Sequence, residues 1–224
     1  MIERHQTVAA VVLDHSECAE VFQRHRIDFC CRGDMSIEDA AKAKNLDAAD
    51  LLRELWSAVA ERHTESSDDP RNLPTAVLVA QIVSRHHDYL RRALPFIQTL
   101  AAKVGRVHGD HNPKLRELDA AVQELATTMA AHIEDEEDAL FPLLLGKGAE
   151  RGALEAQLNA MTEEHRTVAT LLERVRAAAD DFQTPEWACN SYRTLFAELA
   201  DLERDTFAHV HVENHVLRPR FLAA

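Results

Sequence analysis

Four long segments of this chain repeat apolar side chains at alternating steps of three and four residues. They span approximately residues 74–103, 114–145, 152–180 and 185–218. This spacing places one apolar stripe along each α-helix, and long helices joined by short connections pack as antiparallel neighbours. The sequence therefore predicts an all-α protein whose larger part is an antiparallel four-helix bundle.

Prolines lie near the expected helix starts and also inside two of the expected helices. Pro74, Pro113 and Pro185 fall near first turns, where the N–H group that proline lacks would have no partner within the helix. Pro95 and Pro142 fall inside otherwise helical patterns. We therefore expect each of these two prolines to kink or locally break its helix.

The first part of the chain has shorter helical patterns of its own. Ser36 to Asp39 resembles the start of a capped helix, and amphipathic spacing runs from about Asp47 to His63. The polar stretch that follows has no apolar periodicity, as is typical of a linker. We therefore expect a small N-terminal helical domain over residues 1–63, a linker over 64–72 and the bundle over 73–224.

The composition excludes several classes of function. The chain has 38 Asp and Glu residues against 25 Lys and Arg residues, and it lacks the basic clusters on which nucleic-acid binding depends. No apolar run approaches the roughly 18 residues of a membrane helix, and none near the N-terminus is long enough for a secretory signal. Its four cysteines lack C-x-x-C spacing, which fits reduced thiols. We expect a cytoplasmic protein with no nucleic-acid or membrane partner.

Histidine and glutamate interrupt the apolar stripes of the second and fourth segments. His132 and Glu136 are four residues apart, as are His209 and Glu213, so each pair shares one helix face. Both pairs lie in the same context, His-[Ile/Val]-x-x-Glu-x-x-x-Leu-x-Pro. This internal repeat suggests that the two helices have matching roles.

The other two segments also carry histidine on their stripes. His165 lies on the third stripe, whereas the first segment offers His86 or His87, and periodicity alone does not choose between them. In an antiparallel bundle the six imidazole and carboxylate groups fall within a layer on the order of 12 Å thick. Polar groups in a core cost several kcal/mol unless they have partners, and a metal would partner all of them at once.

The number and type of these side chains favour a dinuclear metal site. Six ligands exceed what one tetrahedral zinc uses, whereas two carboxylates bridging two ions would leave open positions for small molecules. Nitrogen and oxygen ligands suit iron or manganese, although affinity order alone favours copper or zinc. The Glu-x-x-His motif of ferritin-like bundles is absent from the sequence. The ligand types alone leave the metal open.

Several motifs, distributed over nearly the whole chain, resemble one known family. They are Asp28-Phe29-Cys30-Cys31-x-Gly33 with Ile37 to Ala41, His87-Asp88 with Leu94-Pro95, His132-x-x-x-Glu136 with Leu140-Phe141-Pro142, Glu164-His165, and His209-x-x-x-Glu213-Asn214. Together they resemble the RIC (repair of iron centres, YtfE/ScdA-type) di-iron proteins, which join a small N-terminal domain to a hemerythrin-like bundle. The sequence departs from that pattern at Arg32 and at Arg218.

The resemblance implies a site with two non-haem iron ions. It implies iron ligands at His87, His132, His165 and His209, with Glu136 and Glu213 as bridging carboxylates, and it chooses His87 over His86. Glu164, beside a ligand, is either a residue that supports the ligands or lines an iron path, or an exposed helix carboxylate.

The remaining cysteines and histidines are assigned from their positions alone. Cys30 and Cys31 suit thiolate chemistry, metal transfer or bonding to a distant cysteine, because adjacent cysteines rarely form a disulfide with each other; the alternative is two small residues packed in a turn. We expect Cys18 and Cys189 to be buried apolar residues. We expect surface positions for four histidines that lie off the stripes: His108, His111, His211 and His215.

The resemblance also implies a function. It implies repair of iron–sulfur or other iron centres damaged by nitrosative or oxidative stress, by iron donation, by handling of nitric oxide, or by both. Partners would then be damaged iron–sulfur proteins or their apo forms, with NO and O2 as small ligands. NO reduction at the di-iron site would make the protein an enzyme, a point that the sequence leaves open together with a homodimeric state. The alternative is a hemerythrin-like O2 or NO sensor or store without repair activity.

Overall fold

The computed structural model describes residues 2–61, 69–146 and 150–222. Over these residues the chain is helical and has no strand beyond one isolated bridge between Thr7 and Ser36. It divides into two compact units, Met1–Leu73 with Val210–Arg220, and Pro74–His209 with Phe221–Ala224. Among the described residues no helix is both long and apolar enough to cross a membrane.

The N-terminal part of the first unit is built from four helices. They are α1 (Val8–Asp14), α2 (Cys18–Arg24), α3 (Ile37–Ala43) and α4 (Ala48–Glu61). Thr7 caps α1 and Ser36 caps α3, each accepting a hydrogen bond from a backbone N–H three residues later, which confirms the capped start predicted at Ser36. Helix α4 packs on α2 and α3, and its Leu51 and Leu55 are fully buried.

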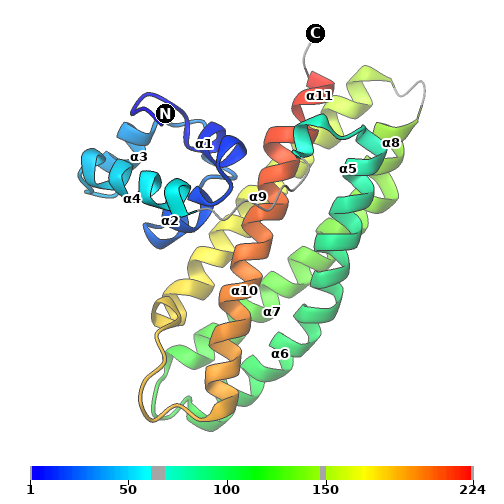
Figure 1. The fold of residues 1–224 in the computed structure, drawn as a ribbon. Helices are drawn as coiled ribbons and strands as arrows, with labels where there is room; N and C mark the ends of the chain where they lie inside the picture. The colour runs from blue at the N-terminus through cyan, green and yellow to red at the C-terminus, as the bar shows by residue number, and fades with distance from the viewer. Residues whose placement is uncertain (1, 62–68, 147–149, 223–224) are drawn as a thin grey trace. The chain divides into compact units, whose positions relative to one another are not determined.

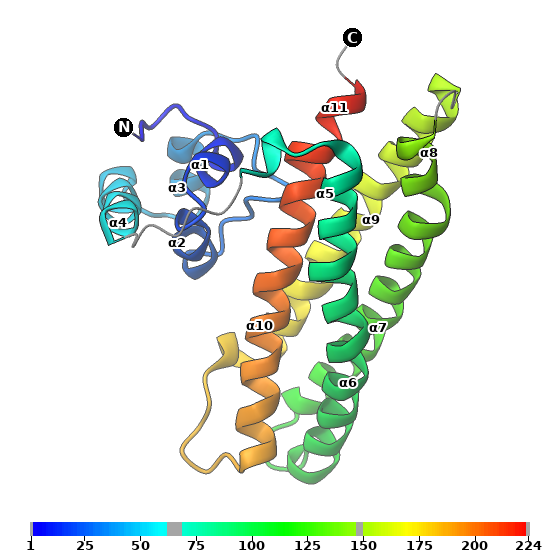
Figure 2. The ribbon, with the colours of Figure 1, turned by 45° about the vertical axis from the view of Figure 1, so that its right-hand side comes forward.

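Four long helical rods form a bundle, which comprises the second unit together with residues Val210–Arg220 of the fourth rod (Figures 1 and 2). The first rod joins α5 (Thr75–Ile82) to α6 (Asp88–His108), and the second joins α7 (Lys114–Asp135) to α8 (Phe141–Leu145). The third is α9 (Arg151–Ala178), and the fourth is α10 (Asn190–Val212), which continues to α11 (Pro219–Leu222). One apolar core connects α6, α7, α9 and α10, so the four predicted stripes do pack together.

Three of the rods contain a π-helical turn, at Val83–His87, Glu136–Leu140 and Glu213–Leu217. Two of these turns end just before a proline. Pro142 and Pro219 cannot donate a backbone hydrogen bond, and their rings clash with the carbonyl four residues earlier, so the helix opens. The preceding N–H groups, of Phe141 and Arg218, bond instead to the carbonyls of Glu136 and Glu213.

The predicted boundaries differ from the structure in three places. Helix α6 continues through Pro95 without the predicted break. Pro185 does not begin the fourth rod, because α10 starts at Asn190, after a connection in which Asp180 to Phe182 have positive φ. Residues 64–68 of the predicted linker lie outside the described residues, and its end forms a short 3₁₀ turn at Pro70–Asn72.

Candidate metal centre

The structure brings together all six side chains predicted to bind metal. Their ligand atoms form two groups, each with atoms within 4.8 Å of one another and each fully buried. The first group is His87, Glu136, His209 and Glu213, and the second is His132, Glu136, His165 and Glu213. Each group therefore has two imidazoles of its own, while the same two carboxylates belong to both.

Local helix geometry explains how these side chains reach one layer. His132 and His165 project from α7 and α9, His209 projects from α10, and Glu213 follows His209 by one turn of the same continuous helix. Glu136 and Glu213 are the first residues of their π turns, and His87 is the last residue of another. Such wide single turns in α-helices are frequent at functional sites because they redirect side chains.

The two carboxylate oxygens of Glu136 face different histidines. Oε2 lies 3.3 Å from Nε2 of His87 and 3.9 Å from Nε2 of His209. Oε1 lies 3.6 Å from Nε2 of His132 and 4.0 Å from Nε2 of His165. One carboxylate can therefore offer one oxygen to each group, which is the arrangement of a bridging ligand.

The imidazole spacing within each group also fits a metal ion. The Nε2 atoms of His87 and His209 are 3.1 Å apart, and those of His132 and His165 are 3.2 Å apart. Two nitrogens bound at about 2.1 Å from one ion would be about 3.0 to 3.4 Å apart, for right-angled to tetrahedral coordination. Both pairs fall within that range.

Neighbouring carboxylates fix the tautomer of one imidazole in each group. Nδ1 of His87 donates to Glu137 over 2.6 Å, and Nδ1 of His132 donates to Glu164 over 2.8 Å. Because a carboxylate accepts these hydrogen bonds, the proton of each neutral imidazole is on Nδ1, and its Nε2 is the atom that can bind a metal. Such outer carboxylates orient metal-binding histidines and raise their basicity.

Glu137 is itself held in place by an arginine. Arg91 Nη2 lies 2.9 Å from the same Oε1 that accepts from His87. Burial alone would raise the pKa of Glu137, but the hydrogen bonds from His87 and Arg91 outweigh it and lower that pKa. Glu137 therefore stays ionised and available as an acceptor for His87.

His86 is also buried but is not part of either group. Its Nδ1 donates to Asp205 over 2.9 Å, and its ring stacks on His209 with centroids 5.2 Å apart. The π turn at Val83–His87 allows two consecutive histidines to be buried, which explains why periodicity alone could not choose between them. His87, the residue that the family resemblance chose, is the one grouped with the carboxylates.

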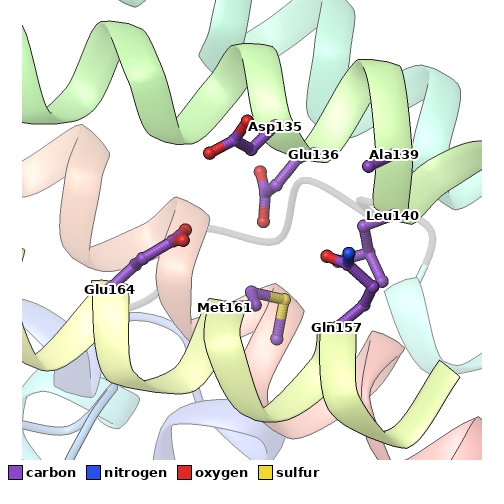
Figure 3. Close-up of a pocket in the computed structure, with 7 residues that line it drawn as sticks. All are labelled: Asp135, Glu136, Ala139, Leu140, Gln157, Met161 and Glu164. Atoms are coloured by element: carbon purple, nitrogen blue, oxygen red, sulfur yellow. The ribbon is translucent and has the colours of Figure 1, made fainter. Parts of the chain in front are cut away.

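A cavity of about 180 Å³ reaches Glu136 from between α7 and α9. Figure 3 shows the carboxylates of Glu136 and Glu164 facing this space from opposite helices, with Met161 and Gln157 along the α9 side. Glu164 is about one-third exposed, so it meets both solvent and His132. A small molecule or an ion could approach the second group through this opening.

The other predicted residues lie outside the two groups. Cys30 and Cys31 lie in the loop between α2 and α3, with Cys30 buried and Cys31 half-buried. Cys18 is buried as expected, but Cys189 is exposed, 3.3 Å from Nε2 of His108, so the prediction of a buried residue there was wrong. Cys189 precedes the true start of α10, where no helix face can bury it.

Two histidines predicted to be on the surface are hydrogen-bonded inside the first unit. His211 is buried and donates from Nδ1 to the Phe29 carbonyl over 3.2 Å, and His215 donates from Nε2 to the Cys30 carbonyl over 2.8 Å. Sequence reasoning also missed Glu137, Arg91 and Asp205. For Glu137, the one available signal was its position in an acidic run directly after Glu136.

Comparison with known proteins finds two matching family models and several similar proteins. Residues 78–221 match the model of the hemerythrin HHE cation binding domain, and residues 4–59 match ScdA_N, a domain of unknown function (DUF542). An iron-sulfur cluster repair protein ScdA of Staphylococcus haemolyticus is 32% identical over 99% of this chain and 100% of its own length. An iron-sulfur cluster repair protein YtfE of Yersinia pseudotuberculosis is 33% identical over 98% of this chain and 97% of its own length.

Proposed function

Because the chain belongs to the hemerythrin-like family of the iron-sulfur cluster repair proteins ScdA and YtfE, we propose that it repairs iron–sulfur and other iron centres damaged by nitrosative or oxidative stress. Iron donation, handling of nitric oxide, or both would be its means. Its partners would be damaged iron–sulfur proteins or their apo forms, together with small ligands such as NO and O2.

The proposal assigns two iron ions to the bundle. A hemerythrin HHE cation binding domain implies bound iron, and the buried histidines and glutamates could hold it. We propose His87 and His209 as ligands of one ion, His132 and His165 as ligands of the other, and Glu136 and Glu213 as bridges. The observation that carries this assignment is the carboxylate of Glu136, whose two oxygens each face a different histidine pair.

The donor set also suits release of the ion. Bound iron would supply open coordination positions for diatomic ligands. The protein's own contribution is to hold four Nε2 lone pairs and two carboxylates in fixed positions. All six ligands are nitrogen or oxygen, so they hold ferrous iron less firmly than thiolates would, and the opening beside Glu164 gives a path to solvent. As part of the same proposal we place the protein in the cytoplasm, since the reducing conditions there keep thiols free of disulfides.

Iron content and recovery from nitric oxide test this proposal together. We expect about two irons per chain, detected by metal analysis and by Mössbauer spectra that change when NO or O2 is added. In cells exposed to NO, loss of the protein should slow recovery of aconitase-type iron–sulfur enzymes. A variant with His132→Ala and His209→Ala should fail to restore recovery, because it removes one imidazole from each group.

The matched control is His111→Ala, an exposed histidine outside both groups. That variant should restore recovery to the level of the unmodified chain. If the variant without His132 and His209 restores recovery equally well, repair is not the function of this centre. Rapid reversible O2 binding without loss of iron would then support a sensor or store instead.

A further inference from the structure

The loop over residues 28–33, called here the thiol loop, brings together three side chains that can bind metal. Cys30 Sγ lies 3.7 Å from Cys31 Sγ and 3.1 Å from Asp28 Oδ1. A ligand atom from each of the three residues lies within 4.8 Å of the others. This cluster differs from the bundle centre in its donors, because it has two sulfurs and one carboxylate but no imidazole.

The spacing of the two sulfurs matches that expected around a single ion. Thiolates bound to zinc at about 2.3 Å in tetrahedral geometry are separated by about 3.8 Å. The observed 3.7 Å is therefore already close to the bound distance. It is also too long for an S–S bond, and neither cysteine is in a disulfide.

Contacts from both ends of the first unit fix the shape of the thiol loop. The Gly33 carbonyl accepts from the N–H of Ala9 over 2.9 Å, and a Cβ added at Gly33 would lie 2.4 Å from the Phe29 carbonyl oxygen. The Cys30 carbonyl accepts hydrogen bonds from the side chains of Asn214 and His215. Ligands held in this way need little rearrangement to bind an ion.

The surroundings of Cys30 disfavour a reactive free thiol. Burial, the hydrogen bond with Cys31 and the nearby charge of Asp28 all raise the pKa of Cys30 well above its usual value. A thiol in such surroundings keeps its proton and is a poor nucleophile. A bound divalent cation would reverse this balance, because it stabilises both thiolates and the carboxylate.

We propose that Asp28, Cys30 and Cys31 form a second metal site, which binds one divalent cation of borderline softness such as Zn²⁺ or Fe²⁺. Binding replaces the two thiol protons by two metal–sulfur bonds and releases both protons to solvent, with no change of oxidation state. Cys31 is half-buried, so the fourth position remains open to water or to an incoming ligand. This proposal does not depend on the function proposed for the bundle.

Co²⁺ added to the full, iron-loaded chain under reducing conditions tests the site. Thiolate ligation gives Co²⁺ an intense near-ultraviolet charge-transfer band, which imidazole and carboxylate ligands do not give. We expect one such Co²⁺ per chain, with the band lost in Cys30→Ser and in Cys31→Ser. Asp28→Asn should weaken binding by at least about tenfold, because the amide oxygen still accepts the backbone N–H bonds of Cys30 and Cys31 but carries no charge.

A double variant with Cys18→Ser and Cys189→Ser is the matched control and should keep the band. A band that disappears in this control, or that is absent from the unmodified chain, overturns the proposal. If either serine variant at the thiol loop fails to fold, alkylation of the unmodified chain decides instead. Zn²⁺ should slow alkylation of Cys31 at least about tenfold without changing that of exposed Cys189, and equal rates with and without Zn²⁺ reject the site.

Discussion

At the scale of single residues, the hydrogen-bond chain from Arg91 through Glu137 to His87 explains how one imidazole is kept ready for a metal. Both bonds end on the same carboxylate oxygen, at 2.9 Å and 2.6 Å. An imidazole without such a partner can rotate or place its proton on Nε2, and either change removes the lone pair from the centre. Glu137 is therefore a positioning residue.

We predict that Glu137→Gln lowers metal affinity by about 10- to 100-fold, the usual effect of losing an outer carboxylate. Glutamine keeps the size of the side chain but can present an N–H to His87 and does not carry the charge that Arg91 pairs with. Chelator competition, followed by metal analysis, measures the loss. Exposed Glu134, in the same acidic run, supplies the control.

Glu134→Gln should leave metal affinity unchanged within the error of the same assay. An equal loss in both variants would mean that general negative charge, rather than the bond to His87, retains the metal. Circular dichroism at the same pH should remain unchanged in both, because neither residue belongs to the apolar core.

Sequence analysis predicted some residues of the metal centre and missed others, for a physical reason. His132, Glu136, His209 and Glu213 interrupt apolar stripes, so the cost of burying them made them visible in the pattern. Glu137 was not visible, because its partner comes from another rod and no periodicity encodes that contact. The same holds for His211, which binds a carbonyl 182 residues away along the chain.

At the scale of helices, the π turns connect proline positions to the placement of the carboxylates. The sequence showed the repeated Glu and Pro six residues apart, and it predicted a local disturbance at Pro142. It could not show that the disturbance would be a wide turn beginning at Glu136, because that depends on which carbonyl the free N–H groups reach. Pro95 lies at no such turn and leaves α6 unbroken.

We predict that Pro142→Ala lowers iron content while the chain stays folded. Alanine restores an N–H that can bond to the carbonyl of Asp138, so an ordinary α-turn competes with the π turn and rotates Glu136 away. Pro95→Ala is the matched change inside another rod and should keep full iron content. Equal iron content in the two variants, measured after identical reconstitution, would show that the π turn is not needed for metal binding.

At the scale of the whole molecule, the residues of the fourth rod are divided between the two compact units. Its residues up to His209 belong to the second unit, whereas Val210–Arg220 belong with the N-terminal helices. Sequence analysis predicted a division near residue 73 and placed Val210–Arg220 in the bundle. The reason is that Glu213 continues the stripe of the bundle, while His211 and His215 face other directions of the same helix and bind the thiol loop.

We predict that removing residues 1–65 leaves the bundle folded with its iron. All six proposed ligands come from the four rods, and their outer partners Glu137, Arg91 and Glu164 do as well. The shortened chain loses the carbonyl partners of His211, Asn214 and His215, so its Tm should fall by several degrees. Metal analysis and calorimetry after reconstitution measure both effects. A shortened chain that is helical but cannot hold iron would show that the N-terminal helices are required to form the centre, contrary to the proposed division.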